Sequence, residues 1–297
     1  MSLDVHAYMK ERARAVDEAL ERSLPPESAP PETVHKTMRY SVFAGGKRLR
    51  PVLVIAGAEA VGGAMGDVMP TACAMELIHT YSLVHDDLPA MDDDDFRRGR
   101  PTSHKVFGDA MAILAGDGLL TLAFRLLAEN LQPGMDGRVL RDVLVGIAEA
   151  AGTGGMVGGQ VADLEAEGRQ VTPEALDYIH LHKTAALIRA SIRSGAALCG
   201  ATPAQLQALA VAGTSLGLAF QIVDDILDVT GTTEQLGKTA GKDQAQQKAT
   251  YPAIHGLAAS RARAEALMAE ALGALQPFGP PAEPLRALGR FILDRKA

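Results

Sequence analysis

The sequence has no tryptophan, few other aromatic residues and only two cysteines among its 297 residues. Phenylalanine and tyrosine together make up 4% of the chain, and alternating runs of β-branched residues are nearly absent, which argues against a β-rich fold. Cys73 and Cys199 both lie in apolar helical sequence and offer neither a disulfide framework nor zinc-ligand spacing. We expect both cysteines in the core.

Long apolar runs and an excess of positive charge are also missing. Glu59, Asp109 and Asp117 interrupt the best candidates for the ~18 to 20 apolar residues that cross a bilayer. The N-terminus, with charged Lys10 and Arg12, lacks a signal-peptide core. The net charge of −7 argues against a nucleic-acid-binding surface. We therefore expect a cytoplasmic protein with no membrane span and no nucleic-acid partner.

Helical periodicity dominates what is present. Alanine, leucine, methionine and charged residues are frequent, and 47% of the residues are hydrophobic, enough for a sizeable core. Glycine and proline interrupt the pattern about every 15 to 30 residues, which predicts about ten or more helices. Thr172-Pro173 and Thr202-Pro203 are typical helix starts. No change of composition marks a linker, so we predict a single all-α domain, residues 1–297, around a central cavity.

One aspartate cluster lies in the second half of the chain, within otherwise apolar helical sequence. An arc of about 100° on this helix contains one amide and three carboxylates: Gln221, Asp224, Asp225 and Asp228. Buried carboxylates this close together require cations among them. We expect this stripe to face a cavity that holds divalent ions.

A similar cluster, with Asp86, Asp87 and Asp92, occurs earlier on a helix that must break at Pro89. His79 precedes Asp86 by seven residues, on the same face and about 10 Å away along the helix axis. That face therefore carries a potential anion donor and a potential metal ligand. The two clusters together predict a metal-dependent enzyme that handles a polyanion.

Two basic segments, residues 45–51 and 97–100, accompany the acidic clusters. Arginine binds phosphate oxygens in a bidentate manner, and lysine supplies a point charge. Either segment alone is typical of a solvated surface, but both together with the carboxylates indicate diphosphate binding. The acidic run 92–95 could also resemble a calcium loop, although the alternating EF-hand spacing and its final glutamate are missing.

Several segments closely resemble the trans-isoprenyl diphosphate synthases, most of all the bacterial farnesyl diphosphate synthases. Two of them carry the motifs Asp-Asp-Leu-Pro-Ala-Met-Asp and Asp-Asp-Ile-Leu-Asp. Phe96 departs from the leucine often found in the family but leaves the site residues unchanged. The resemblance implies the all-α isoprenoid synthase fold and a homodimer. The matching segments are 45–51, 79–99, 158–163, 182–184, 220–228 and 236–252.

The resemblance also implies a magnesium-dependent condensation of isopentenyl diphosphate with dimethylallyl or geranyl diphosphate, using three magnesium ions. Magnesium prefers few carboxylates plus phosphate and water oxygens. The implied metal ligands are Asp86, Asp92 and Asp224, with Asp87, Asp225 and Asp228 in or near the same shell.

The implied substrate-binding residues fall into two groups. One group holds the diphosphate of isopentenyl diphosphate: Lys47, Arg50, His79 and Arg98. The other holds the allylic substrate: Arg97, Lys183, Thr184, Gln221 and Lys238. In the second group the lysines bind the leaving diphosphate, and Thr184 and Gln221 offer oxygen dipoles to the developing carbocation.

Tyr81, five residues before Asp86, lies where the family closes the floor of its product pocket. A ring there should stop growth near three isoprene units, which favours farnesyl diphosphate. Ser82 is small, so a geranylgeranyl or geranyl diphosphate synthase is the alternative. Terpene cyclases generally lack the second diphosphate site, and non-catalytic synthase subunits typically lose an aspartate cluster. A calcium or polyanion buffer would bind metal without turnover.

Overall fold

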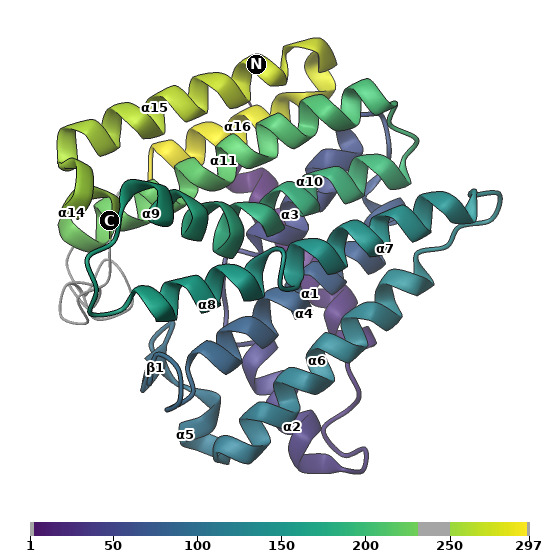
Figure 1. Ribbon diagram of the computed structural model, residues 1–297. Helices are drawn as coiled ribbons and strands as arrows, with labels where there is room; N and C mark the ends of the chain where they lie inside the picture. Colours follow the sequence, from purple (N-terminus) through teal and green to yellow (C-terminus); the bar gives the residue numbers. More distant parts are fainter. Residues whose placement is uncertain (1–2, 231–249, 296–297) are drawn as a thin grey trace.

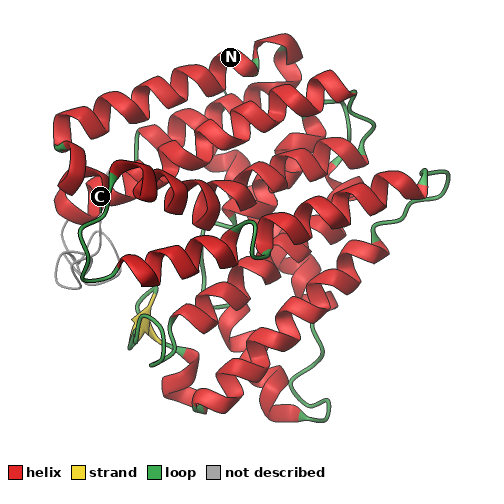
Figure 2. Ribbon diagram, viewed as in Figure 1, coloured by secondary structure: helices red, strands yellow, loops and turns green. Residues whose placement is uncertain are grey.

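Helices account for nearly all regular structure in the computed structural model, which describes residues 3–230 and 250–295 (Figures 1 and 2). The prediction of an all-α fold is confirmed. The elements before the acidic loop are α1 (Val5–Ser23), α2 (Glu32–Val42), α3 (Leu49–Glu59), the 3₁₀ turn η1 (Met65–Val68) and α4 (Met69–Asp86). A hairpin, β1 (Phe96–Arg97) and β2 (Arg100–Pro101), then precedes α5 (Ser103–Phe107), α6 (Asp109–Glu129), α7 (Gly137–Ala151) and α8 (Met156–Ala166).

The second half of the chain is built around one long helix, α11. The elements there are α9 (Pro173–Ile179), the π-helical turn η2 (His180–Ala185), α10 (Ala186–Leu198), α11 (Pro203–Thr230), α14 (Tyr251–His255), α15 (Leu257–Ala274), the 3₁₀ turns η3 (Gln276–Phe278) and η4 (Pro280–Ala282), and α16 (Glu283–Leu293). No regular element interrupts α9, η2 and α10, which follow one another directly.

Two large hydrophobic clusters form most of the interior. The first joins α1, α4, α6 and α7, and the second joins α3, α10, α11, α15 and α16. Helix α4 packs along α6 and α3, while α10 packs along both α3 and α11. Figure 1 shows these long helices in successive rows, with α15 and α11 on one side and α6 on the other. Burial of their apolar faces is the main source of stability.

A pair of glycines lets α3 and α10 approach closely. A Cβ on Gly57 would lie 2.2 Å from the carbonyl oxygen of Ile192, and one on Gly195 would lie 1.9 Å from that of Val54. Any side chain at either position would therefore push the helices apart. Because α3 follows the basic loop and α10 continues η2, this contact sets the separation of two parts of the cavity wall.

The local expectations mostly match the structure. Thr172 caps α9 by accepting from the backbone N–H of Ala175, and Thr202 does the same for Gln205 at the start of α11. Helix α4 ends before Pro89. Cys73 is buried, whereas Cys199 is only half-buried. The hairpin was not expected, because two-residue strands are too short to show a periodicity.

The expectation that no apolar run is long enough to cross a bilayer needs correction. By length and mean hydropathy, α6 and α11 each contain a window that is apolar enough to do so. In the structure 44% of the α6 window and 50% of the α11 window are buried inside the protein. Both helices therefore use their apolar faces in the core of this fold.

Candidate active site

The predicted residues meet at a cavity of about 920 Å³ whose wall is formed by the basic loop, α4, the acidic loop, α8, η2, α11 and α16. Lys238 lies outside the described residues. Asp87, Asp92, Asp225 and Asp228 are not part of the wall. The predicted residues that line it are Lys47, Arg50, His79, Tyr81, Ser82, Asp86, Arg97, Arg98, Lys183, Thr184, Gln221 and Asp224.

Asp86 presents the carboxylate of the first cluster to the cavity. The backbone N–H of Asp92 donates to the Asp86 carbonyl at 2.8 Å, so the acidic loop turns back toward the end of α4. Burial raises the pKa of Asp86 to about 6, the carboxylates of Asp92 and Asp87 act in the same direction, and Lys183 opposes them. The charged form of Asp86 is therefore disfavoured unless a cation binds beside it.

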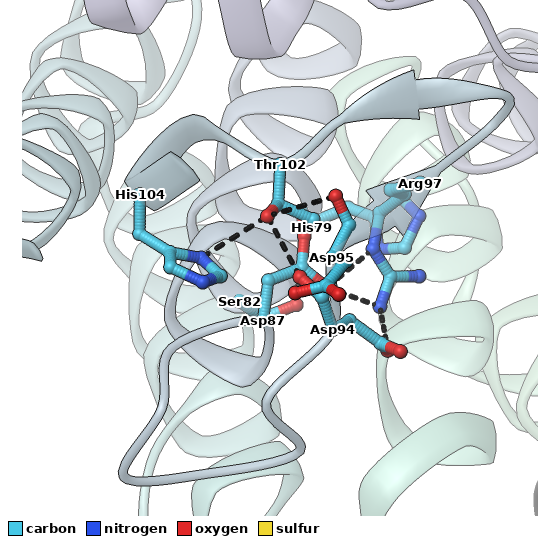
Figure 3. A network of polar contacts seen from close by, with 8 residues as sticks. All are labelled: His79, Ser82, Asp87, Asp94, Asp95, Arg97, Thr102 and His104. Carbon is cyan, nitrogen blue, oxygen red and sulfur yellow. Dashed lines mark hydrogen bonds and ion pairs between the residues drawn. The ribbon is translucent and has the colours of Figure 1, made fainter. Parts of the chain in front are cut away.

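Asp87, unlike Asp86, is paired with an arginine. Arg97 donates from Nε to Asp87 Oδ1 at 2.7 Å, and its Nη2 lies 3.4 Å from Asp94 (Figure 3). The Thr102 hydroxyl donates to the Asp94 carbonyl at 2.7 Å and lies 3.1 Å from His104 Nδ1. This network, drawn in Figure 3, holds the acidic loop and the hairpin together and fixes the side chain of Arg97 at the cavity.

Arg50, His79 and Arg98 form a basic region of the wall. Arg50 makes no hydrogen bond or ion pair with any described residue, and burial lowers its pKa to about 10. Burial and the neighbouring Arg50 and Arg98 also lower the pKa of His79 well below its usual value, so His79 is neutral at pH 7. A half-buried arginine without a carboxylate partner, beside a second arginine, indicates an anion site.

The basic loop supplies two further features. Lys47 Nζ lies 5.6 Å from the centre of the Phe291 ring, at the edge of the same wall. Arg98 donates to the Gly45 carbonyl, and a Cβ on Gly46 would lie 2.6 Å from Arg98 Cζ. The absence of a side chain at Gly46 thus leaves room for the guanidinium group of Arg98.

Arg48, between two cavity residues, has a structural role. Its backbone adopts φ 50°, and its side chain is buried. Arg48 donates to Glu76 at 2.7 Å, to Asp17 at 2.8 Å and to the Val42 carbonyl at 2.7 Å. The loop is therefore anchored to α1 and α4 at the residue between Lys47 and Arg50.

The stripe predicted on α11 is only partly correct. Gln221 and Asp224 face the cavity, and Asp224 accepts from Arg295 at 2.9 Å. Asp225 and Asp228 are buried away from it, each with 4% of its surface exposed. A helical wheel gives directions along one helix, but the depth of each position depends on its neighbours, here η2 and α14.

Lys183 is positioned by α8. A Cβ on Gly159 would lie 2.2 Å from the backbone nitrogen of Lys183, so α8 touches η2 at a glycine. One turn later Asp163 accepts from Lys183 Nζ at 2.6 Å. The π-helical turn carries Lys183 and Thr184, and both side chains reach the cavity.

Sequence reasoning missed several wall residues. The amide of Gln160 is buried and has no hydrogen-bond partner among the described residues, and the matching segment 158–163 was the signal that could have identified it. Phe220, Phe291 and Arg295 also line the cavity, and Arg295 lies over the Phe220 ring. No local pattern near the C-terminus indicated that α16 would reach this site.

The carboxylates at the cavity can be compared with the ligands that magnesium prefers. Among residues 3–230 and 250–295, no three His, Cys, Asp or Glu side chains converge closely enough to enclose a metal ion. Carboxylates spread over two walls suit an ion that takes only one or two protein ligands and completes its shell with phosphate oxygens and water. The residues present therefore fit magnesium carried in with a diphosphate.

Comparisons with known proteins agree with this geometry. The polyprenyl synthetase family model matches residues 31–277. A dimethylallyltranstransferase of Fischerella ambigua is 50% identical over 97% of this chain and 83% of its own length, and a farnesyl diphosphate synthase of Geobacillus stearothermophilus is 49% identical over 87% of each chain. The solved geranylgeranyl pyrophosphate synthetase of Pyrococcus horikoshii has a TM-score of 0.90 at 32% identity, covering 99% of both chains. The chain therefore belongs to the polyprenyl synthetase family and is a trans-prenyltransferase that lengthens prenyl diphosphates head to tail.

Proposed function

We propose that this chain condenses isopentenyl diphosphate with dimethylallyl and geranyl diphosphate and stops at farnesyl diphosphate. The observation that carries the proposal is a single cavity lined both by carboxylates and by cations that have no carboxylate in hydrogen-bond contact. Asp86 lies near Lys183 and Arg97, and Asp224 pairs with Arg295 at the same cavity. Arg50 and Arg98 have no carboxylate in hydrogen-bond contact. The carboxylates suit a metal-bound diphosphate, and the cations without carboxylates suit a diphosphate bound by cations alone.

We propose Asp86, Asp92 and Asp224 as the residues that would hold magnesium. When bound, magnesium would supply positive charge to the departing diphosphate. Lys183 and Arg97 add cations that lie near enough to Asp86 to lower its pKa. Asp163, Asp87 and Asp94 hold these two side chains in place before substrate arrives.

The proposed reaction has three steps. The allylic carbon–oxygen bond breaks, and its electron pair leaves with the diphosphate. The double bond of isopentenyl diphosphate then forms a carbon–carbon bond with the allylic cation, and a proton leaves the product cation. We propose the departing diphosphate as the proton acceptor. Apolar wall residues such as Phe220, Met156 and Leu164 limit the access of water to the cation.

Purified protein incubated with magnesium, isopentenyl diphosphate and either dimethylallyl, geranyl or farnesyl diphosphate tests this proposal. We expect consumption of the first two allylic substrates and a C15 product by chromatography. Efficient elongation of farnesyl diphosphate would identify a C20 synthase instead, and no consumption of isopentenyl diphosphate would contradict the proposed function.

Tyr81 supports the C15 assignment. It is buried on α4, about 7.5 Å below Asp86 along the helix axis. Its ring contacts the His85 ring edge-on, with 5.8 Å between centroids. We predict that Tyr81→Ala shifts the main product from C15 to C20 or longer, because removing the ring opens the floor. Tyr81→Phe is the matched control and should keep C15, and an unchanged C15 product from Tyr81→Ala would rule out the floor role.

We also propose that two copies of the chain associate. Ile113 and Leu114 on α6 and Val145 on α7 are large apolar side chains that remain exposed on two helices in mutual contact. Light scattering should give the mass of a dimer, and Leu114→Glu should lower it toward that of a monomer. A monomeric wild-type protein at assay concentration would contradict this proposal.

A further inference from the structure

A chain of contacts leads from the cavity into the interior between η2, α11 and α14. The Thr184 hydroxyl donates to Gln221 Oε1 at 2.8 Å, and Gln221 Nε2 donates to Asp225 Oδ1 at 3.0 Å. The other carboxylate oxygen, Asp225 Oδ2, accepts from the backbone N–H of Tyr251 at 2.8 Å and lies 3.4 Å from His180 Nε2. Thr184 and Gln221 line the cavity, whereas Asp225 and His180 do not.

The chemistry of these groups fixes the direction of every hydrogen bond. An ionised carboxylate only accepts, so Asp225 must receive the NH₂ end of the Gln221 amide. The carbonyl end of Gln221 then points to Thr184, whose single hydroxyl hydrogen is used in that contact. The remaining lone pairs of the Thr184 hydroxyl and of Gln221 Oε1 are therefore available to the cavity, whereas the Thr184 hydrogen is not. That polarity suits a developing carbocation and opposes an anion.

His180 lies at the end of this series of contacts that is farthest from the cavity. It is buried in the first position of the π-helical turn, three residues before Lys183 and four before Thr184. Its Nδ1 has no hydrogen-bond partner among the described residues, so Asp225 is the polar contact that the structure gives this ring. The ring also stacks on Tyr251, with 6.0 Å between centroids.

We propose that His180 is a positioning residue that, through Asp225, fixes the orientation of the Gln221 amide and so turns the oxygens of Gln221 and Thr184 toward the allylic cation. Asp225 in this scheme is a structural anchor for those dipoles and not a magnesium ligand. The inference rests on the proposed role of Thr184 and Gln221 in prenyl transfer.

Three single variants separate the polar contact at 3.4 Å from packing. His180→Leu removes the Nε2 contact with Asp225 and keeps much of the volume, whereas His180→Gln places an N–H near the former Nε2. We expect His180→Leu to lower kcat by about 10- to 100-fold, as for other partners that orient a site group, with KM for both diphosphates unchanged. His180→Gln should recover most of kcat. His255→Leu is the control, because His255 also contacts the Tyr251 ring but not Asp225.

A double-mutant cycle tests the route of the effect. If His180 acts through Gln221, then His180→Leu should cause little further loss in a Gln221→Ala background. Asp225→Asn, which keeps the shape but allows the amide to turn over, should reproduce the kcat loss without a change in magnesium dependence. Far-UV circular dichroism and urea unfolding of each variant identify any that fail to fold.

The outcomes are distinct. Unchanged kcat in folded His180→Leu, failure of glutamine to recover activity, or losses that multiply in the double mutant would each overturn the positioning role. A strongly raised magnesium requirement in Asp225→Asn would instead make Asp225 a metal ligand. A wild-type protein that does not consume isopentenyl diphosphate would refute the proposed function, which is a separate result.

Discussion

Replacing Asp86 with asparagine should lower kcat by about 10³-fold, the range for losing one group that stabilises transition-state charge. The substitution keeps the shape of the side chain and removes one negative charge from the cavity wall. Asp86 stands at the end of α4 beside Asp92 and opposite Lys183, where the proposed leaving group develops its charge. Initial rates with isopentenyl and geranyl diphosphate at saturating magnesium measure the effect.

Asp93→Asn is the matched control for Asp86→Asn. Asp93 belongs to the same acidic loop, is exposed, and does not line the cavity. Its φ of 46° is one that asparagine also adopts readily. The control should retain wild-type kcat. Equal losses in both variants would show that net charge of the loop, and not the position of Asp86, determines the rate.

Replacing Glu76 with leucine should lower the free energy of unfolding by about 3 kcal/mol, the lower end of the range for breaking a buried ion pair. The loss is large because Arg48 is buried with 3% of its surface exposed and would keep its charge. It stays at the lower end because Asp17 and the Val42 carbonyl still accept from Arg48. Urea denaturation followed by circular dichroism measures the change.

Two comparisons isolate the cause of that loss. Arg48→Met combined with Glu76→Leu removes both charges, so part of the stability should return. Glu32→Leu breaks an exposed pair with Lys36 on α2 and should leave the unfolding midpoint unchanged. A double variant that is less stable than Glu76→Leu alone would contradict the explanation by an unpaired charge. We also expect Glu76→Leu to raise KM for isopentenyl diphosphate, because the basic loop loses its anchor.

The helical fold and the two acidic clusters could be predicted from the sequence because both depend on local patterns. The periodicity of apolar residues gave the helices, and Asp86 and Asp224 were correctly placed at one cavity. Roles that depend on partners far along the chain could not be predicted. Asp225 lies in the same motif as Asp224, but its contact with the backbone of Tyr251 comes from a different helix.

The directions of side chains in loops also could not be predicted from the sequence. Lys47, Arg48 and Arg50 are equivalent as charges in the sequence, yet only Arg48 turns to the buried pair with Glu76. Its backbone is left-handed at φ 50°, and arginine is not a residue type that signals such a conformation. The contribution of Arg295 required tertiary contacts of α16 that leave no pattern near it.

The π-helical turn between α9 and α10 also has a consequence for how this chain can evolve. A π turn holds one residue more than the α-helical turn it replaces. Deleting one residue there would restore a regular helix but rotate everything on one side by about 100° relative to the other. His180 and Thr184 could then no longer reach their separate partners, Asp225 and Gln221. The contacts of His180 and Thr184 therefore constrain the number of residues in this turn as well as their types. Changes in this segment are expected to be substitutions and not deletions.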